Sequence, residues 1–481
     1  MIKTLLIANR GEIAVRIIRA AKELGIVSII AYSEADEESK AVGLADEKVC
    51  IGQAMSKKSY LNIEGIIDAA KEVNADAIHP GYGFLAENPL FAASVESAGI
   101  IFVGPRSETI ELMGNKINAR KAAIDAGVPI IPGSTGNIED IASGKKIAEE
   151  LGFPIMIKAA GGGGGKGIRQ VNSFTEFEEN IDEVKREALA GFGNSEIFLE
   201  KSITNARHVE VQVLSDGKNY FHFFERDCSL QRKKQKLWEE APALDISEKL
   251  RAQMCAAAIT LVKNLRYKGV GTVEFIYEPE SENFFFMEMN TRIQVEHPVT
   301  EVITGVDLVR LGLLIAGGFP LELRQEDISI KGHAIEVRIN AEDPTRDFFP
   351  SPGQVATLRI PGGPGIRFDS NIYQGYEIPP YYDSLIGKLI AFDEDRKKTI
   401  KRLKRALGEL HIDGIHTTVD LFRLLVQDQE IQRGPVNTLW LEKWIEDKNT
   451  NQFSKYFSCN NENDLLAEFF FLISNLYSSE D

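Results

Sequence analysis

The amino-acid sequence predicts an α/β protein built from several domains. Its N-terminal third alternates short apolar runs with amphipathic helical segments, which is the pattern of a parallel sheet with crossover helices. The chain has 481 residues, and at about 100 to 200 residues per domain this length suggests two to four domains. The content of 43% hydrophobic and 26% charged residues is typical of a soluble globular protein.

The predicted elements alternate in type through the first hundred residues. Their order is a strand at 5–8, a helix, a strand at 27–33, a helix at 63–73, a strand at 77–78, a helix at 91–98 and a strand at 100–104. The first helix has an apolar face formed by Ile13, Ile17, Ala21 and Leu24. No G-x-G-x-x-G follows the first strand, which disfavours a dinucleotide-dependent oxidoreductase. The loops at 9–12 and 79–89 are rich in glycine and charge, and are either plain turns or the rim of a site.

Composition argues against several classes of protein. The net charge of −16 disfavours a nucleic-acid surface, which needs a broad basic patch. Neither a disulfide framework nor a zinc site is indicated by the four widely spaced cysteines, Cys50, Cys228, Cys255 and Cys459. No leader is evident, and no apolar run approaches the about 20 residues that span a bilayer. We expect a cytoplasmic protein that binds neither nucleic acid nor membrane, and whose anionic ligands meet basic residues gathered locally.

A run of five glycines stands out in PIMIKAAGGGGGKG, residues 154–167. Glycine costs backbone entropy and supplies no side chain, so the run favours close approach of backbone N–H groups to a ligand. Lys158 and Lys166 add positive charge, which indicates a phosphate cradle. A flexible linker is the alternative, but the strand-like flanks argue against it. The run does not match the Walker pattern G-x-x-x-x-G-K-[ST], and we interpret it as a hairpin lid over phosphates.

Two further stretches carry polar side chains in patterns of interest. IFLEK, residues 197–201, is typical of an edge strand that could present Glu200 to a purine, and HVEVQVL places His208, Glu210 and Gln212 on one face. On its own this alternation is usually an ordinary half-buried strand. Four cations then occur within five residues, Arg232, Lys233, Lys234 and Lys236. They form either a solvated charge run or an anion site, and the acidic character of the chain favours the second.

Carboxylates occur in two neighbouring strand-like segments. Glu274 lies inside the apolar strand GVGTVEFIY, where an ionised carboxylate is costly unless paired or bound to metal. If MEMNTRIQVEHPVTE, residues 287–301, is extended, five polar side chains share one face: Glu288, Asn290, Arg292, Gln294 and Glu296. The plain alternative is the wet face of a surface strand. Oxygen ligands beside a phosphate lid suit Mg²⁺, which predicts a magnesium and phosphate site.

These motifs together resemble biotin carboxylase, the ATP-grasp component of biotin-dependent carboxylases such as acetyl-CoA, acyl-CoA or pyruvate carboxylase. The motifs are KAAGGGGGKG, RHVEVQVL, ERDCSLQR, GTVEF, MEMNTRIQVEHPVTE, INAEDP and PPYYDSLIGKLI, and the likeness runs from IANRGEIA to about residue 445. It implies a three-part fold: an N-terminal parallel α/β domain at 1–113, an ATP-grasp domain at 114–330 with a mobile lid at about 131–202, and a C-terminal α+β domain at 331–445. The tail at 446–481 matches no motif, and its apolar run is expected to form a helix that packs on the protein or docks a partner.

The resemblance implies an ATP-dependent ligase that phosphorylates bicarbonate to carboxyphosphate and then carboxylates biotin. ATP would contact Lys116, Lys158, Gly163, Gly164, Gly165, Glu200, Lys201, Ile203, His208, Gln231 and Lys234. Mg²⁺ or Mn²⁺ would bind Glu274 and Glu288 with Asn290 beside them. Bicarbonate would contact Lys236, Arg292, Gln294 and the Val295 N–H. Glu296 would be the base that takes the bicarbonate proton, and Arg338 would stabilise the enolate-like oxygen of deprotonated biotin.

The implied partners are a separate biotin carboxyl carrier protein, carboxyltransferase subunits and a second copy of the chain in a homodimer. We expect biotin to arrive in trans, because no lysine adjoins a methionine as in the carrier signature A-M-K-M, and too few residues follow 445 for a carrier domain. The final carboxyl acceptor stays open. The alternatives are a different ATP-grasp carboxylate ligase and a catalytically silent nucleotide-binding regulator. Two departures from relatives are Lys234, where many carry histidine, and Trp238, where close relatives have valine.

Overall fold

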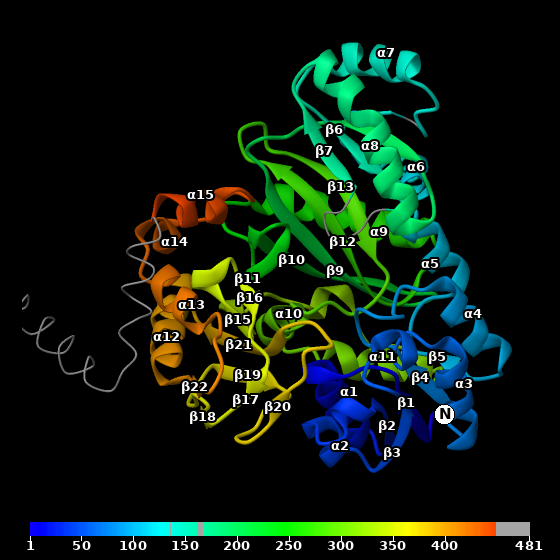
Figure 1. The fold of residues 1–481 in the computed structure, drawn as a ribbon, viewed down its shortest axis with the longest axis vertical. Coiled ribbons are helices and arrows are strands. Elements are labelled where there is room, and N and C mark those ends of the chain that lie inside the picture. The colour runs from blue at the N-terminus through cyan, green and yellow to red at the C-terminus, as the bar shows by residue number, and fades with distance from the viewer. Residues whose placement is uncertain (135, 162–166, 449–481) are drawn as a thin grey trace, which may run out of the picture.

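The computed structural model describes residues 1–134, 136–161 and 167–448 (Figure 1). The N-terminal part and the C-terminal part lie side by side at the base of the molecule, and a small unit with its own helices projects from the opposite end. A long antiparallel sheet joins these regions. Among the described residues, no helix is both long enough and apolar enough to cross a bilayer.

The N-terminal sheet has five parallel strands in the order β3-β2-β1-β4-β5, as the alternating pattern predicts. Its strands are β1 Thr4–Ile7, β2 Val27–Ser33, β3 Glu47–Gly52, β4 Ala77–His79 and β5 Ile101–Phe102, and its helices are α1 Gly11–Glu23, α2 Lys40–Leu44, α3 Ile63–Glu72 and α4 Pro89–Ser97. Leu5 and Ile7 pack with α1 on one face, while Leu6 packs with α3 and α4 on the other, because successive strand residues point to opposite faces. Strand β3 was missed because it is a mostly exposed edge strand without an apolar run.

The central sheet has eight strands in the order β13-β12-β9-β10-β11-β14-β21-β19. They are β9 Arg207–Asp216, β10 Tyr220–Arg232, β11 Gln235–Ala241, β12 Lys268–Glu278, β13 Asn283–Asn290, β14 His333–Asn340, β19 Ile366–Ser370 and β21 Leu385–Asp393. The helices that pack on or beside it are α9 Glu248–Asn264, α10 His297–Thr304, α11 Leu308–Ala316 and α12 Arg396–Glu409. Strand β11 pairs with β14, with Trp238 opposite Val337, so one sheet crosses the boundary that we place near residue 330.

Strand β9 corrects the expectation of a half-buried strand at HVEVQVL. Nine of its ten residues are buried, so both its apolar and its polar faces are covered. Because β9 lies between β12 and β10, its polar side chains need partners within the protein. The alternation therefore marks a buried polar layer.

The projecting unit contains the sheet β7-β6-β8. Its elements are α7 Ile141–Leu151, β6 Ile155–Ala159, β7 Ile168–Val171, α8 Phe174–Phe192 and β8 Ile197–Lys201, and α5 Ser107–Gly114 and α6 Lys116–Asp125 lead into it. The predicted hairpin is confirmed, with Lys158 opposite Ile168, and β8 is an edge strand as expected. A separate apolar core containing Ile157, Phe177 and Leu199 holds this unit together. Gly163, Gly164 and Gly165 lie outside the described residues.

The segment from Glu288 to Glu296 is not extended throughout. The expectation that its five polar side chains share one face of a strand is therefore wrong. Strand β13 ends at Asn290, residues 291–296 form a loop, and α10 begins at His297 with a proline in its first turn. The reason is that the loop backbone binds side chains instead of a neighbouring strand: Thr291 N donates to Glu87, and the Gln294 carbonyl contacts the His297 ring. The turn of this loop, and not strand alternation, brings the polar side chains of residues 288–296 close together.

The C-terminal region adds short strands and helices around β14, β19 and β21. The strands are β15 Glu342–Asp343, β16 Phe349–Pro350, β17 Gly353–Gln354, β18 Thr357–Arg359, β20 Glu377–Ile378 and β22 His411–Asp413, and the helices are α13 Val419–Leu425, α14 Gln429–Arg433 and α15 Trp440–Asp447. They enclose an apolar core that reaches from Leu230 on β10 to Trp444 on α15. The tail helix that we expect beyond residue 448 lies outside the described residues.

Candidate active site

Two carboxylates face each other across β12 and β13. Glu274 and Glu288 are direct cross-strand partners, and their side chains therefore lie on the same face of the sheet. Like charges placed directly opposite each other destabilise a sheet unless cations separate them. Lys116 Nζ lies 3.1 Å from Glu288, and Asn290 Nδ2 donates to Glu274 at 2.6 Å. The two carboxylates thus lie on one face of the sheet, next to its edge strand β13.

Lys236 on β11 lies at the centre of three carboxylates. Its Nζ is 2.6 Å from Glu210 Oε2, 3.0 Å from Glu274 Oε1 and 2.6 Å from Glu296 Oε1. Burial disfavours the charged ammonium, but the three carboxylates outweigh it and raise the pKa of Lys236 well above its ordinary value. Lys236 is therefore a fixed cation that joins the two acidic strands to the loop after β13.

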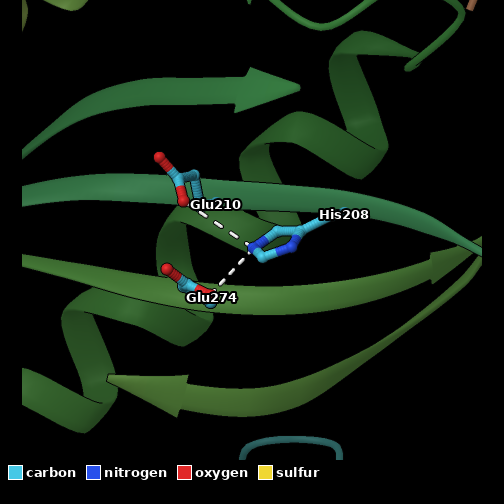
Figure 2. Close-up of side chains that lie close together, drawn as sticks. All are labelled: His208, Glu210 and Glu274. Carbon is cyan, nitrogen blue, oxygen red and sulfur yellow. Dashed lines mark ion pairs between the residues drawn. The ribbon is translucent and has the colours of Figure 1, made fainter. Parts of the chain in front are cut away.

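His208 contacts the same acidic cluster (Figure 2). Its Nε2 lies 2.8 Å from Glu274 Oε2 and 3.8 Å from Glu210 Oε2. In the part of the chain that the structure describes, the groups with metal-ligand spacing are His208, Glu210 and Glu274, and Glu210, Cys228 and Glu296. Lys236 contacts all three carboxylates of these groups, and Arg226 and Arg338 add ion pairs to Glu210 and Glu296, so the carboxylates already have cationic partners within the protein.

Glu296 is held between two cations. Its Oε1 accepts from Lys236, and its Oε2 accepts from Arg338 at 2.9 Å. Burial alone would favour the neutral acid, but Lys236 and Arg338 outweigh it and hold the pKa of Glu296 below its ordinary value. The side chain is 1% exposed and ionised at neutral pH, so it can accept a proton.

Arg338 on β14 connects Glu296 to a second group of acids. Its Nε donates to Glu239 at 2.5 Å. Burial raises the pKa of Glu239 to about 7, although Arg338 opposes this shift. Glu336, opposite Glu239 on the next strand, is fully buried and neither of its oxygens has a hydrogen-bond partner among the described residues. Burial also raises the pKa of Glu336 well above its ordinary value, so this carboxyl keeps its proton.

The loop at 291–296 is fixed by side chains from four other segments. Arg292 Nε donates to Glu87 at 2.7 Å, from the loop before α4. Gln294 accepts from the fully buried Arg226 at 2.8 Å and donates to Glu274 at 2.6 Å, which sets the orientation of its amide. The Val295 carbonyl accepts from Lys388 Nζ at 2.7 Å. The structure thus brings Arg292, Gln294, Val295 and Glu296 together beside Lys236.

The residues expected around the nucleotide lie on α6, β6, β8, β9 and β10, and in the connections that follow β8 and β10. Lys158 is ion-paired with Glu200, which also accepts from Arg120 at 2.8 Å. Lys201 Nζ donates to the Gly152 carbonyl at 2.7 Å, so its ammonium is turned towards the loop before β6. Ile203 follows β8 and is half-buried, and Gln231 is buried with its amide 2.8 Å from His208 Nδ1.

The cationic side chains of residues 232–236 point in two different directions. It forms a tight hairpin between β10 and β11 with Lys233 and Lys234 in the left-handed region, at φ of 46° and 65°. Arg232 and Lys233 pair with Asp347 and turn away from the carboxylate cluster. Burial, with Lys158 and Lys116 nearby, lowers the pKa of Lys234. Only Lys234 and Lys236 therefore face the lysines and carboxylates of the site.

Several site residues were not identified individually from the sequence. Glu87 lies in the loop at 79–89, Arg226 in ERDCSLQR and Lys388 in PPYYDSLIGKLI. With Glu239, they were not assigned to the site, because the contacts that bring them there form only when distant segments pack together. Glu210 was noted for its strand face, and its burial at 0% exposure could have been inferred only by placing β9 inside a sheet. A charged residue inside an apolar strand, as with Lys388 in LIGKLIAF, was the available signal.

The antiparallel sheet, its ion-paired carboxylates and the lysine-bearing hairpin unit define an ATP-grasp ligase. Three family models cover nearly all of the described chain: "Biotin carboxylase, N-terminal domain" at residues 1–110, "Carbamoyl-phosphate synthase L chain, ATP binding domain" at 115–324 and "Biotin carboxylase C-terminal domain" at 336–443. The chain belongs to the biotin carboxylase family.

Individual relatives agree with this assignment. The chain is 53% identical over 445 residues to a biotin carboxylase of Haemophilus influenzae, covering 92% of this chain and 99% of the relative. Its structure resembles a biotin carboxylase complex from Campylobacter jejuni, with a TM-score of 0.90, 44% identity and coverage of 92% and 99%. It also resembles the biotin carboxylase domain dimer of Hydrogenobacter thermophilus 2-oxoglutarate carboxylase, solved with MgADP, ADP and bicarbonate, with a TM-score of 0.88, 46% identity and coverage of 92% and 98%.

Proposed function

We propose that this chain catalyses the first half-reaction of a biotin-dependent carboxylase, in which MgATP phosphorylates bicarbonate and the carboxyl group passes to biotin on a separate carrier. The observation that carries the proposal is the position of Glu296 between Lys236 and Arg338. Glu296 is an ionised carboxylate between two cations: Lys236, which would bind bicarbonate, and Arg338, which would face biotin. This position suits a base that removes a proton where two anionic reactants meet.

The phosphoryl-transfer side is assigned to the lysines and the facing carboxylates. Lys116 and Lys158, with the amides of the glycine run, would neutralise the ATP phosphates, since this transfer depends mainly on alignment and charge. Glu200, Lys201 and Ile203 would surround the adenine, with His208, Gln231 and Lys234 near the nucleotide. The cross-strand pair Glu274 and Glu288 fits a hard cation such as Mg²⁺ or Mn²⁺, with Asn290 beside them, and this ion would supply charge neutralisation between phosphates.

The carboxyl-transfer side is assigned to the loop after β13 and to β14. Arg292, Gln294, Lys236 and the Val295 N–H would bind bicarbonate, because a planar guanidinium matches a flat anion better than a flexible ammonium alone. Glu296 would remove the bicarbonate proton so that an oxygen can attack the γ-phosphate. Arg338 would stabilise negative charge as it develops on the biotin ureido oxygen, an interaction that is strongest in the transition state.

The decisive experiment measures ATP hydrolysis by the purified chain. Hydrolysis should require bicarbonate and Mg²⁺ and should rise on addition of free biotin. Hydrolysis driven by an amino acid, without any effect of biotin, would instead favour a different ATP-grasp carboxylate ligase. No nucleotide turnover under any of these conditions would favour a silent regulator.

The carrier is proposed to be a separate biotinylated protein, with carboxyltransferase subunits and a second copy of this chain completing the assembly. The support from this chain is that none of its seven methionines adjoins a lysine. Tethering raises the effective concentration of biotin, so a biotinylated carrier should be a far better substrate than free biotin. An avidin blot of the purified chain should be negative, and a biotin signal on this polypeptide would contradict the proposal.

A further inference from the structure

Lys388 is a buried lysine that the reaction chemistry does not require directly. It lies on β21, it is fully buried, and it comes from the C-terminal region. Taking an ammonium out of water is costly unless partners compensate for it, and a buried cation therefore needs a physical explanation. Its Nζ has two partners: the Glu12 carboxylate at 3.0 Å and the Val295 carbonyl at 2.7 Å.

Glu12 balances the charge of Lys388 from the N-terminal domain. It lies in the first turn of α1, which packs against β19 and β21, and it is 2% exposed. Tyr82 also donates a hydrogen bond to Glu12, from the loop between β4 and α4. Burial raises the pKa of Glu12, although Lys388 opposes the shift. The two charges therefore hold each other in place where the N-terminal and C-terminal parts meet.

The bond to Val295 distinguishes this lysine from a simple partner for Glu12. Peptide groups are planar and trans, so a carbonyl that is bound on one side directs the following N–H to the other side. The Gln294 carbonyl contacts His297 at 2.7 Å, and the Val295 carbonyl accepts from Lys388. The two successive peptide groups that carry the Val295 and Glu296 N–H groups are thus both fixed by hydrogen bonds to their carbonyl oxygens.

Lys388 also stands directly opposite Arg338 on the neighbouring strand. Two cations at opposed positions repel each other unless each has its own carboxylate. Arg338 has Glu239 and Glu296, and Lys388 has Glu12. An apolar residue at position 388 with a neutral residue at position 12 would balance the charge equally well. The hydrogen bond from Lys388 to the Val295 carbonyl is what such a pair could not provide.

We propose that Lys388 is a positioning residue for carboxylation, which holds the Val295–Glu296 peptide so that Glu296 stays aligned with Lys236 and Arg338. Glu12 keeps the ammonium of Lys388 in place and makes this alignment depend on the docking of α1. The inference rests on the proposed role of Glu296 as the base. Displacement of a reacting group by about 1 Å can cost about 10²-fold in rate.

The test compares Lys388→Met, Lys388→Arg and the double variant Glu12→Gln/Lys388→Met in bicarbonate-dependent ATP hydrolysis and biotin carboxylation. Lys388→Met should lower kcat by about 10²-fold and leave the KM for ATP within about threefold, since ATP contacts lie elsewhere. Lys388→Arg keeps a donor and should recover part of the rate. The double variant removes both buried charges, so it should regain thermal stability relative to Lys388→Met but keep the low kcat.

Arg396→Met is the matched control, because it removes a buried cation from an ion pair with Glu240, 2.7 Å away, on the other face of the sheet. It should lower stability and leave kcat unchanged. A double variant with the kcat of the native chain would show that Lys388 only balances charge and would overturn the inference, even if Lys388→Met alone does not fold. A native chain without bicarbonate-dependent hydrolysis would instead overturn the proposed function and the inference with it.

Discussion

Replacement of Glu296 by glutamine should abolish most of the carboxylation rate without unfolding the protein. Glutamine keeps the shape of the side chain and one acceptor oxygen, but it cannot take a proton at neutral pH. General-base catalysis contributes about 10² to 10⁴ in rate, which is about 3 to 5 kcal/mol of activation free energy at about 1.36 kcal/mol per tenfold. We therefore expect kcat for biotin carboxylation to fall by that factor.

The effect of Glu296→Gln on stability should be smaller than the effect on rate. Removing one partner of a buried ion pair typically costs about 3 to 5 kcal/mol, because a charge is left uncompensated. Here Lys236 retains Glu210 and Glu274, and Arg338 retains Glu239. No cation is left alone, so we expect a loss of about 1 to 3 kcal/mol in the free energy of unfolding, comparable to one impaired buried hydrogen bond.

The assay follows ADP release and the incorporation of labelled bicarbonate into biotin, with ATP affinity measured separately by calorimetry. Because Lys236 and Arg338 hold the pKa of Glu296 below its ordinary value, the native base is ionised throughout the neutral range, and raising the pH should not rescue the variant. Glu240→Gln is the matched control: Glu240 is also buried and ion-paired, at 2.7 Å from Arg396, but it faces away from the site. The lower limit of the expected factor is about 10², so a Glu296→Gln protein that keeps clearly more than about one hundredth of the native kcat would refute the assignment of the base. A loss of ATP affinity equal to the loss of rate would also refute it.

Further predictions concern the metal, the anion clamp, the lid and a buried acid. Glu288→Gln should raise the Mg²⁺ concentration needed for half-maximal activity before it lowers kcat, and a normal metal requirement in a metal titration would argue against this ligand. Arg292→Ala should lose carboxylation by several orders of magnitude while nucleotide binding persists, and loss of ATP binding in calorimetry would place it in the metal and phosphate site instead. Nucleotide should slow hydrogen exchange in the segment at about 131–202, and equal exchange with and without ATP would exclude a closing lid. Glu336 keeps its proton in the folded state and releases it in the unfolded state, so above the ordinary pKa of a glutamate the folded state binds more protons and the free energy of unfolding should fall as the pH rises. Glu336→Gln should remove this contribution to the pH dependence, measured by urea unfolding at a series of pH values. An unchanged pH dependence would show that Glu336 is ionised in the folded protein.

Local patterns predicted those parts of the fold that depend on neighbouring residues. The alternating strands and helices of residues 5–104 gave the parallel sheet, and the glycine run between strand-like flanks gave the hairpin of β6 and β7. Periodicity reports which face of an element is buried, but not which element covers it. For this reason the sequence could not indicate that β9 is central, or that β11 pairs with β14.

The candidate site divides in the same way. Motif resemblance drew attention to Glu274, Glu288 and Glu296 because they lie in distinctive local sequences, and their roles remain predictions. Lys388 and Glu12 are separated by most of the chain, and their ion pair exists only after the N-terminal and C-terminal regions have packed together. Both residues lie in stretches that carry the resemblance, IANRGEIA and PPYYDSLIGKLI, but their contacts with each other and with Val295 could not be predicted because the tertiary fold sets them.

The central sheet has a consequence for synthesis on the ribosome. Strand β11 pairs with β14, and Glu240 meets His333 from 93 positions later in the chain. At about 5 to 20 residues per second, the edge of β11 stays unpaired for about 5 to 20 seconds after it is made. An exposed strand edge of that kind can pair with another nascent chain. A slow ribosome between these strands should therefore lower the soluble yield of the protein, and a chain that stops before residue 333 should be a target for chaperones instead of a stable ATP-grasp fragment.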